Sequence, residues 1–161
     1  MKSAGSARIV GALLASLVVA TSVTVAQTDP RIGSWKLNLE KSKYDPGPAP
    51  KSDVRNYEAT ADGTKATVEA TPASGSPGKV TYTAKLDGKD YPTSGSTAFD
   101  TIAIKSIDTN TIEVTLKKAG KVMQTSRSVV SKDGKTMTNT VMGTDADGRP
   151  VHNVIVFDKQ P

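Results

Sequence analysis

The sequence predicts an all-β protein, an antiparallel up-and-down meander of about eight to ten strands that closes into a barrel. Segments rich in Thr, Val and Ile alternate apolar and polar residues with a period of two, which is typical of half-buried strands. Four Asp-Gly pairs, typical of tight hairpin turns, separate several of these segments. An open sheet of so many strands would leave its apolar face wet, so the sheet is expected to curl and close.

The strands are expected in sequence, separated by turns and two longer loops. Segments 40–51 and 72–78 are rich in proline and glycine, so they cannot run through the middle of a sheet and are expected to be surface loops. The expected strands lie at about 32–39, 53–61, 64–71, 79–86, 89–92, 100–107, 111–118, 121–131, 135–144 and 150–158.

Three turns predict which residues face each other. Two-residue turns at Asp62-Gly63 and Asp87-Gly88 and a three-residue loop at 108–110 each place apolar residues together on one face. That shared face is expected to be the barrel interior. The predicted opposite pairs are Tyr57 with Val68, Ala59 with Ala66, Ala84 with Tyr91, Ile104 with Val114 and Ile102 with Leu116.

The last third of the chain is less regular. Apolar residues stand on both faces of 121–131, so the pattern leaves open whether Arg127 points inward or outward. The final strand carries the continuous apolar run 154–157, as expected where both faces of a strand are covered.

The first 26 residues have the pattern of a secretory signal peptide. Lys2 and Arg8 precede or flank a twelve-residue apolar run, and Thr24-Val25-Ala26 supplies the small residues of a cleavage site. The run is too short to span a bilayer comfortably. We therefore expect a leader at 1–26, a single domain at 27–161, and an exported protein that is periplasmic or secreted.

Composition narrows the classes of partner and chemistry. The chain has no cysteine, so a disulfide framework, thiolate catalysis and cysteine-based metal sites are excluded. Loss of the leader lowers the formal net charge from +5 to +3, and the basic residues occur in pairs rather than runs. We expect a monomer that binds no nucleic acid.

The motifs resemble those of a known superfamily. Gly33-Ser34-Trp35 is a G-x-W at the start of an antiparallel barrel, which resembles the lipocalin and fatty-acid-binding superfamily. Segments 35–52, 87–92, 100–108, 131–138 and 143–153 are similar to small exported lipocalin-like bacterial proteins, a group without an established activity. The resemblance implies a calycin-type barrel and, by analogy, binding of a small apolar ligand.

The candidate ligand-binding residues are Trp35, Tyr57, Tyr82, Tyr91 and Arg127. In lipocalin-like barrels the matching Trp packs across the barrel end, often against an arginine from a late strand, and Arg127 is the candidate for that role. The alternative places Arg127 in the cavity, facing a ligand carboxylate. The three tyrosines are inward by register, either as core packing or as walls of a cavity.

Catalytic and metal sites find little support. His152 is the only histidine, and its setting is that of an ordinary strand residue. The serines lack a nucleophile elbow, and the Asp-Gly pairs lack the spacing of a calcium loop. We expect no enzyme activity, no cofactor and no metal.

Two functions remain as hypotheses. The first is an exported, non-catalytic lipocalin-like barrel that binds a small hydrophobic or amphiphilic molecule. The alternative is a structural or protein-interaction barrel whose interior is packed and takes no ligand. An integral outer-membrane barrel is disfavoured because the single apolar face is needed inside. A cavity of several hundred Å³ would separate the two hypotheses.

Overall fold

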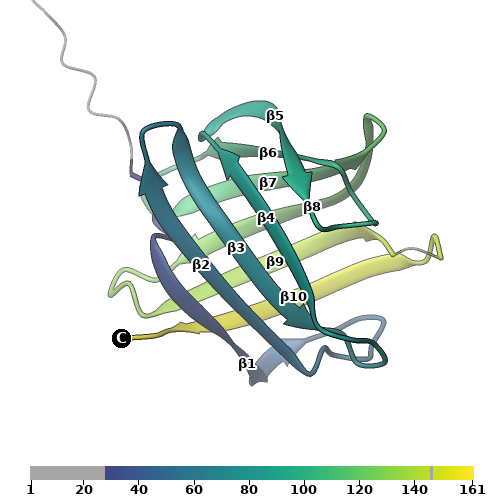
Figure 1. Cartoon of the computed structure of the whole chain (residues 1–161). Helices are drawn as coiled ribbons and strands as arrows, with labels where there is room; N and C mark the ends of the chain where they lie inside the picture. Colours follow the sequence, from purple (N-terminus) through teal and green to yellow (C-terminus); the bar gives the residue numbers. More distant parts are fainter. Residues whose placement is uncertain (1–27, 146) are drawn as a thin grey trace, which may run out of the picture.

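A computed structural model describes residues 28–145 and 147–161, so the predicted leader at 1–26 lies outside the described residues. The described chain is all β, and its ten strands form a closed antiparallel barrel in which each strand pairs with the next and the last pairs with the first (Figure 1). This confirms the predicted fold class. Among the described residues, no helix is long and apolar enough to cross a membrane.

The strands follow the predicted order, and the first and the fifth strands are longer than expected. The first strand continues to Lys43, so the proline-rich loop starts at residue 44 rather than 40. The strands are β1 (Gly33–Lys43), β2 (Ser52–Thr60), β3 (Gly63–Thr71), β4 (Gly78–Ala84), β5 (Asp87–Ser94), β6 (Thr101–Ser106), β7 (Thr111–Lys118), β8 (Lys121–Val130), β9 (Thr136–Thr144) and β10 (Pro150–Lys159).

A bulge explains the longer β1. The register between β1 and β10 shifts between Asn38 and Lys43. Within the bulge, the Ser42 hydroxyl donates to the carbonyl oxygen of Asn38 at 2.6 Å and accepts from the Val156 N–H at 2.9 Å. A side chain thus replaces a missing backbone partner, and the strand continues past the bulge.

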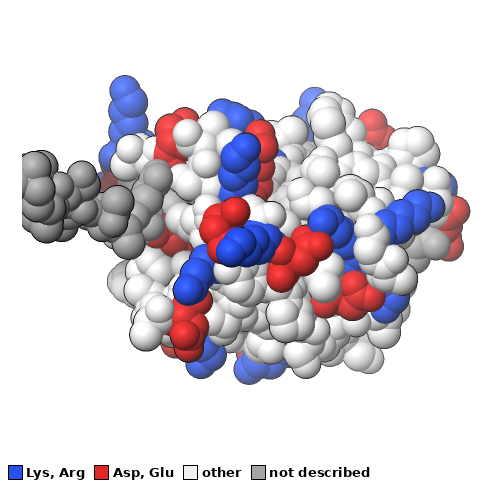
Figure 2. Space-filling model, turned by 90° about the horizontal axis from the view of Figure 1, so that it is seen from above, with Lys and Arg blue, Asp and Glu red and all other residues white. Residues whose placement is uncertain are grey.

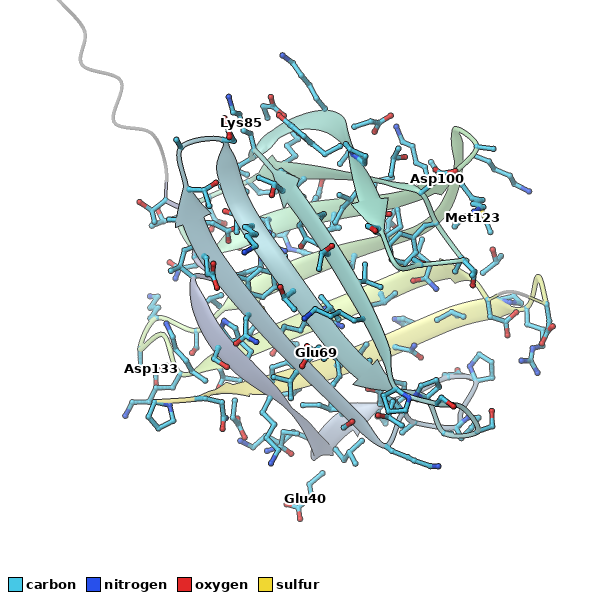
Figure 3. All side chains as sticks on the ribbon, in the orientation of Figure 1. Glu40, Glu69, Lys85, Asp100, Met123 and Asp133 are labelled. Atoms are coloured by element: carbon cyan, nitrogen blue, oxygen red, sulfur yellow. The ribbon has the colours of Figure 1, made fainter. Side chains whose placement is uncertain are left out.

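The barrel has two ends, which differ in their loops. We call the end formed by the turns at 61–62, 85–86, 107–110 and 131–135 the plugged end, because residues 28–32 lie against it. The other end, formed by the loops at 44–51, 72–77, 95–100 and 119–120 and by residues 145 and 147–149, is called the mouth. Asp133 and Lys85 mark the plugged end in Figure 3, and Met123 and Asp100 mark the mouth.

The first predicted hairpin has the right faces and the wrong register. Its two turn residues are Ala61 and Asp62, so Tyr57 faces Ala66 instead of Val68. A slip of two residues keeps every side chain on its predicted face. Gly63 belongs to the strand with a φ of +127°, and a side chain there would clash with the carbonyl oxygen of Ala84. The glycine therefore serves close strand packing rather than the turn itself.

The third predicted hairpin is confirmed in full, and the second only in part. Ile104 pairs with Val114 and Ile102 with Leu116, which confirms the third register. In the second hairpin β4 and β5 pair at Thr81–Ser94 and Tyr82–Thr93, in the predicted register. The predicted pair of Ala84 with Tyr91 is absent from that ladder.

The second hairpin opens because its turn is held by a different strand. The carbonyl oxygen of Leu86 accepts from the Ser106 N–H at 3.3 Å, so the chain turns toward β6 rather than back onto β4. The Asp87-Gly88 pair thus starts β5 instead of closing a tight turn.

The interior is packed at the plugged end. The largest side chains with almost no exposed surface are Trp35, Ile104, Ile112, Met137 and Phe157. Strand β8 turns the face that carries Ser128 toward the interior, because Ser128 is buried whereas Val129 is exposed. The half of the barrel near the mouth therefore has serines and amides where an ordinary core has aliphatic residues.

The outer wall carries charges of both signs, which are interspersed on the face seen in Figure 2. Glu69 points outward (Figure 3), and its carboxylate lies 3.0 Å from the Lys79 ammonium with both side chains more than half exposed. Glu69→Lys is therefore expected to change the free energy of unfolding by no more than about 0.5 kcal/mol in urea titrations. A loss of several kcal/mol would mean that the inner and outer faces are exchanged.

Candidate functional site: the barrel cavity

A cavity of about 310 Å³ occupies the half of the barrel near the mouth. Two hollows on the mouth share wall residues with it: one shares Phe99, Leu116 and Gln124, and the other shares Gln124 and Asn153. The cavity therefore lies next to the surface hollows of the mouth. Its lining comprises Arg31, Asp53, Arg55, Tyr57, Val68, Ala70, Val80, Tyr82, Phe99, Ile102, Val114, Leu116, Gln124, Thr125, Ser126, Ser128, Asn139, Val141, Asn153 and Ile155.

The wall has an apolar side and a polar side. The apolar residues Val68, Val80, Ile102 and Val114 come from β3, β4, β6 and β7. Strands β8, β9 and β10 contribute mainly hydroxyl and amide side chains, among them Gln124, Ser126, Ser128, Asn139 and Asn153. A molecule inside would meet hydrocarbon on one side and hydrogen-bonding groups on the other.

A charged pair on β2 lies at the cavity wall. The Arg55 guanidinium donates from Nε and Nη2 to the Asp53 carboxylate, with the Nη2 bond at 2.6 Å. The face of this guanidinium lies over the Phe157 ring, 4.4 Å from its centroid. Both residues point inward because residues two apart on a strand share a face with Tyr57. The ring and the carboxylate fix the position of Arg55.

A second pair forms the floor of the cavity. Residues 28–32 precede β1, and Arg31 donates from Nε and Nη2 to the Asp29 carboxylate at 3.0 and 2.8 Å. Its guanidinium lies 4.5 Å from the Tyr57 ring centroid, and its Nη1 donates to the Tyr82 hydroxyl at 3.4 Å. Arg31 thus reaches from the N-terminal arm into the barrel and separates the cavity from the outside at the plugged end.

These pairs stay ionised, and their charges cancel. Burial alone would lower the pKa of Arg31 and of Arg55, but the nearby carboxylates and tyrosines outweigh it and raise both pKa values. Burial alone would likewise raise the pKa of Asp29, but Arg31 outweighs it and holds that pKa below its usual range. Burial raises the pKa of Tyr82 to about 12. The Tyr82 hydroxyl therefore stays neutral at any physiological pH.

Two polar atoms at the wall lack partners. Among the described residues, the Ser128 hydroxyl oxygen and the Asn139 side-chain oxygen are the buried side-chain atoms that make no hydrogen bond. The two residues face each other across β8 and β9, and they are 3% and 5% exposed. A buried polar atom without a partner costs about 1–3 kcal/mol. The polar side of the wall thus contains two unsatisfied oxygens that are covered by protein atoms.

The predicted site residues divide into two groups. Tyr57 and Tyr82 line the cavity, and Trp35 is buried in the packed half without lining it. The Trp35 indole N–H donates to the Arg31 carbonyl oxygen at 2.6 Å. Tyr91 lies outside the cavity lining, with its hydroxyl donating to Asp87 at 3.0 Å.

The position of Arg127 contradicts both of the roles predicted for it. Its side chain is half exposed on the outer wall, and its Nη1 lies 3.8 Å from a Glu113 carboxylate oxygen. Because Ser126 and Ser128 take the inward positions on β8, the residue between them points outward. Arg127 thus neither covers Trp35 nor enters the cavity. The cation over the Trp35 ring is the Lys159 ammonium, 5.2 Å from its centroid.

Arg31 and Arg55 are the charged arginines of the site, and they are among the lining residues that the sequence interpretation missed. Each follows an aspartate by two positions, at Asp29-Pro30-Arg31 and Asp53-Val54-Arg55. Since Tyr57 was assigned to the interior, the same period of two places Arg55 and Asp53 on that face. Charged residues on a predicted core face were therefore the available signal.

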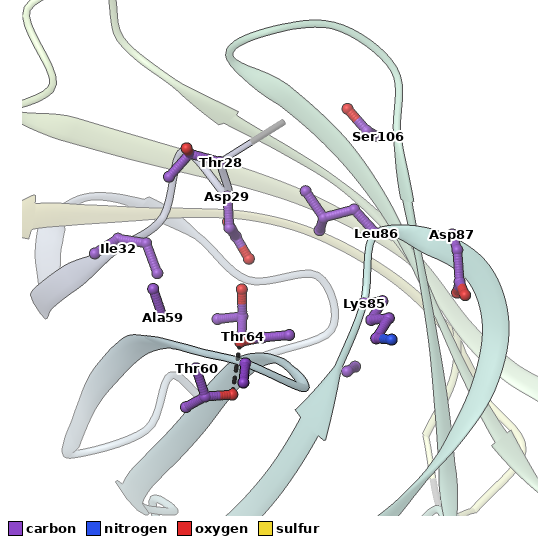
Figure 4. A pocket seen from close by; sticks show the side chains of 13 residues that line it. Thr28, Asp29, Ile32, Ala59, Thr60, Thr64, Lys85, Leu86, Asp87 and Ser106 are labelled. Atoms are coloured by element: carbon purple, nitrogen blue, oxygen red, sulfur yellow. Dashed lines mark hydrogen bonds between the residues drawn. The ribbon is translucent and has the colours of Figure 1, made fainter. Parts of the chain in front are cut away.

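A second, more open hollow of about 580 Å³ lies outside the plugged end (Figure 4). It lies where the turn at 85–86 separates from the β2–β3 hairpin, and Asp29 and Ile32 of the N-terminal arm form part of its wall. Its hairpin side is tied by the Thr60 hydroxyl, which donates to the Gly63 carbonyl oxygen at 2.8 Å. In the described ranges 28–145 and 147–161, no three His, Cys, Asp or Glu side chains are grouped to hold a metal ion.

Comparisons with known protein families, with curated proteins and with solved structures found no match to this chain.

Proposed function

We propose that this protein is an exported, non-catalytic lipocalin-like barrel that binds a small hydrophobic or amphiphilic molecule inside. The observation that carries the proposal is the cavity of about 310 Å³ in an otherwise packed barrel. Small-molecule sites have volumes of roughly 300–1,000 Å³, so this cavity is at the lower end of the range. The predicted leader and the G-x-W motif support export and the lipocalin-like assignment.

The mixed wall supports an amphiphilic ligand over a purely apolar one. An alkane would cover the hydroxyl and amide groups that β8, β9 and β10 present to the cavity without giving them partners. A ligand with a polar group at one end bonds to these groups and leaves its hydrocarbon against Val80 and Val114. The pairs around Arg31 and Arg55 hold this geometry in place before binding, which lowers the entropic cost of association.

The alternative is a structural or interaction barrel with a packed interior. Close packing is found around Trp35 and Phe157, at the plugged end. The hollow half near the mouth favours binding, because interiors that serve packing alone contain few voids larger than a water molecule.

A neutral fluorescent probe tests the proposal. N-phenyl-naphthylamine is expected to bind with one equivalent at saturation, because the cavity of about 310 Å³ has room for one such molecule. Ala70→Trp adds an indole to the cavity wall and is expected to abolish binding while the circular dichroism spectrum is retained. Val122→Trp, at a position on β8 that is 50% exposed, is the matched control and is expected to bind as the wild type does. Absence of saturable binding to the wild type would contradict the proposal.

A further inference from the structure

We infer that the ligand of this cavity is an uncharged molecule with one polar end, such as an amide or an alcohol, rather than a carboxylate. The inference rests on the proposed function and names the chemical class of its ligand. It follows from the charge balance of the cavity.

Each arginine at the cavity already has its anion. Asp53 occupies Nε and Nη2 of Arg55, and Asp29 occupies the same two nitrogens of Arg31. A carboxylate ligand would have to displace one aspartate, or would add an uncompensated negative charge in a site of low dielectric. Both arginines can therefore donate their remaining hydrogen bonds only to neutral acceptors.

The remaining donors of the guanidinium groups face neutral partners. The Nη1 of Arg31 donates to the Tyr82 hydroxyl, and Arg55 interacts with the Tyr57 hydroxyl. The phenol of Tyr82 stays protonated because its pKa is raised to about 12. Among the charged residues lining the described cavity, only Arg31, Asp53 and Arg55 occur, and Asp29 completes the balance from behind Arg31. These four charges sum to zero.

The volume limits the size of the molecule. About 310 Å³ equals the share of about ten water molecules in the liquid, at about 30 Å³ each. This space suits a short acyl chain or a compact molecule of two or three rings with one polar end.

The inference is tested with three eight-carbon probes of equal chain length: octanamide, octanol and octanoate. Isothermal titration calorimetry at neutral pH is expected to show that octanamide and octanol bind the wild type at least about tenfold more tightly than octanoate. Asp53→Asn removes the anion beside Arg55 with little change of shape, so the variant is expected to reverse the preference toward octanoate. Glu69→Gln, the same loss of charge on the outer wall, is expected to retain the wild-type order.

The outcomes separate this inference from the proposed function. Octanoate binding as tightly as octanamide would overturn the neutral-ligand inference and leave the binding function standing. If none of the three probes binds, the inference is also overturned, and the naphthylamine probe decides the proposed function.

Discussion

Replacing Asp29 by alanine is expected to lower the free energy of unfolding by about 3–5 kcal/mol, because it leaves the Arg31 guanidinium buried without its anion. The Arg31 and Asp29 side chains are 4% and 1% exposed, so water does not replace the lost carboxylate. Urea titrations followed by circular dichroism measure the change. The carboxylate also accepts a hydrogen bond from the Arg31 backbone N–H at 2.9 Å. The substitution therefore also removes the hydrogen bond that holds the turn before β1.

The pair is also expected to make stability depend on pH. The pKa of Asp29 is lower in the folded protein than its ordinary value of 3.8. Its contribution is therefore complete above the unfolded pKa and is lost as the pH falls through the folded pKa. The difference in stability between the wild type and Asp29→Ala should shrink in acid. A difference that grows in acid would contradict this assignment.

A double variant separates loss of the pair from exposure of the turn. Asp29→Ala with Arg31→Met removes both charges and is expected to recover part of the lost stability, because a buried pair is worth less than its broken half costs. Glu113→Ala, which removes one partner of the exposed Arg127 pair, is expected to change the free energy of unfolding by less than about 1 kcal/mol. Equal losses in Glu113→Ala and Asp29→Ala would refute the structural difference between the two pairs.

Trp35→Ala is expected to cost about 3–5 kcal/mol of stability, as deletions of large buried aromatic side chains do. Trp35 is 0% exposed, its indole N–H is bonded to the Arg31 carbonyl oxygen, and Lys159 covers its ring. The substitution therefore removes packing and frees the segment that carries Arg31. In the wild type the fluorescence of this single Trp should be blue-shifted and should move to the red on unfolding.

The control for this substitution lies on the same strand. Leu39 is 47% exposed, so Leu39→Ala is expected to change stability by no more than about 0.5 kcal/mol. A solvent-like emission maximum in the folded wild type, or equal stability of the Trp35→Ala variant, would contradict the burial of Trp35.

The barrel was predictable from the sequence because alternation and turn residues are local signals. The Ile102–Leu116 and Ile104–Val114 pairs follow from the loop at 108–110 alone. The register of the first hairpin was not fixed in this way, since Gly63 lies in the strand for close approach to Ala84 and the turn moves back by one residue. The predicted inward and outward faces of this hairpin are still correct, because the register shifts by an even number of residues.

The site was harder to predict because it depends on contacts between distant segments. The floor of the cavity joins Arg31 to Tyr82, residues 51 positions apart, and nothing local in either segment indicates this contact. Strand β8 has apolar residues on both faces, so its alternation did not show that Ser126 and Ser128 point inward. The predicted role of Arg127 was wrong for that reason.

Binding of a small molecule in the interior is tested most directly by native mass spectrometry of the protein purified from its own host. The wild type is expected to carry a non-covalent small-molecule adduct that is released on unfolding, and the Ala70→Trp variant, whose cavity is filled, is expected to lack it. Identical spectra for the wild type and the Ala70→Trp variant, with the folded state verified for both, would contradict ligand binding in the barrel cavity.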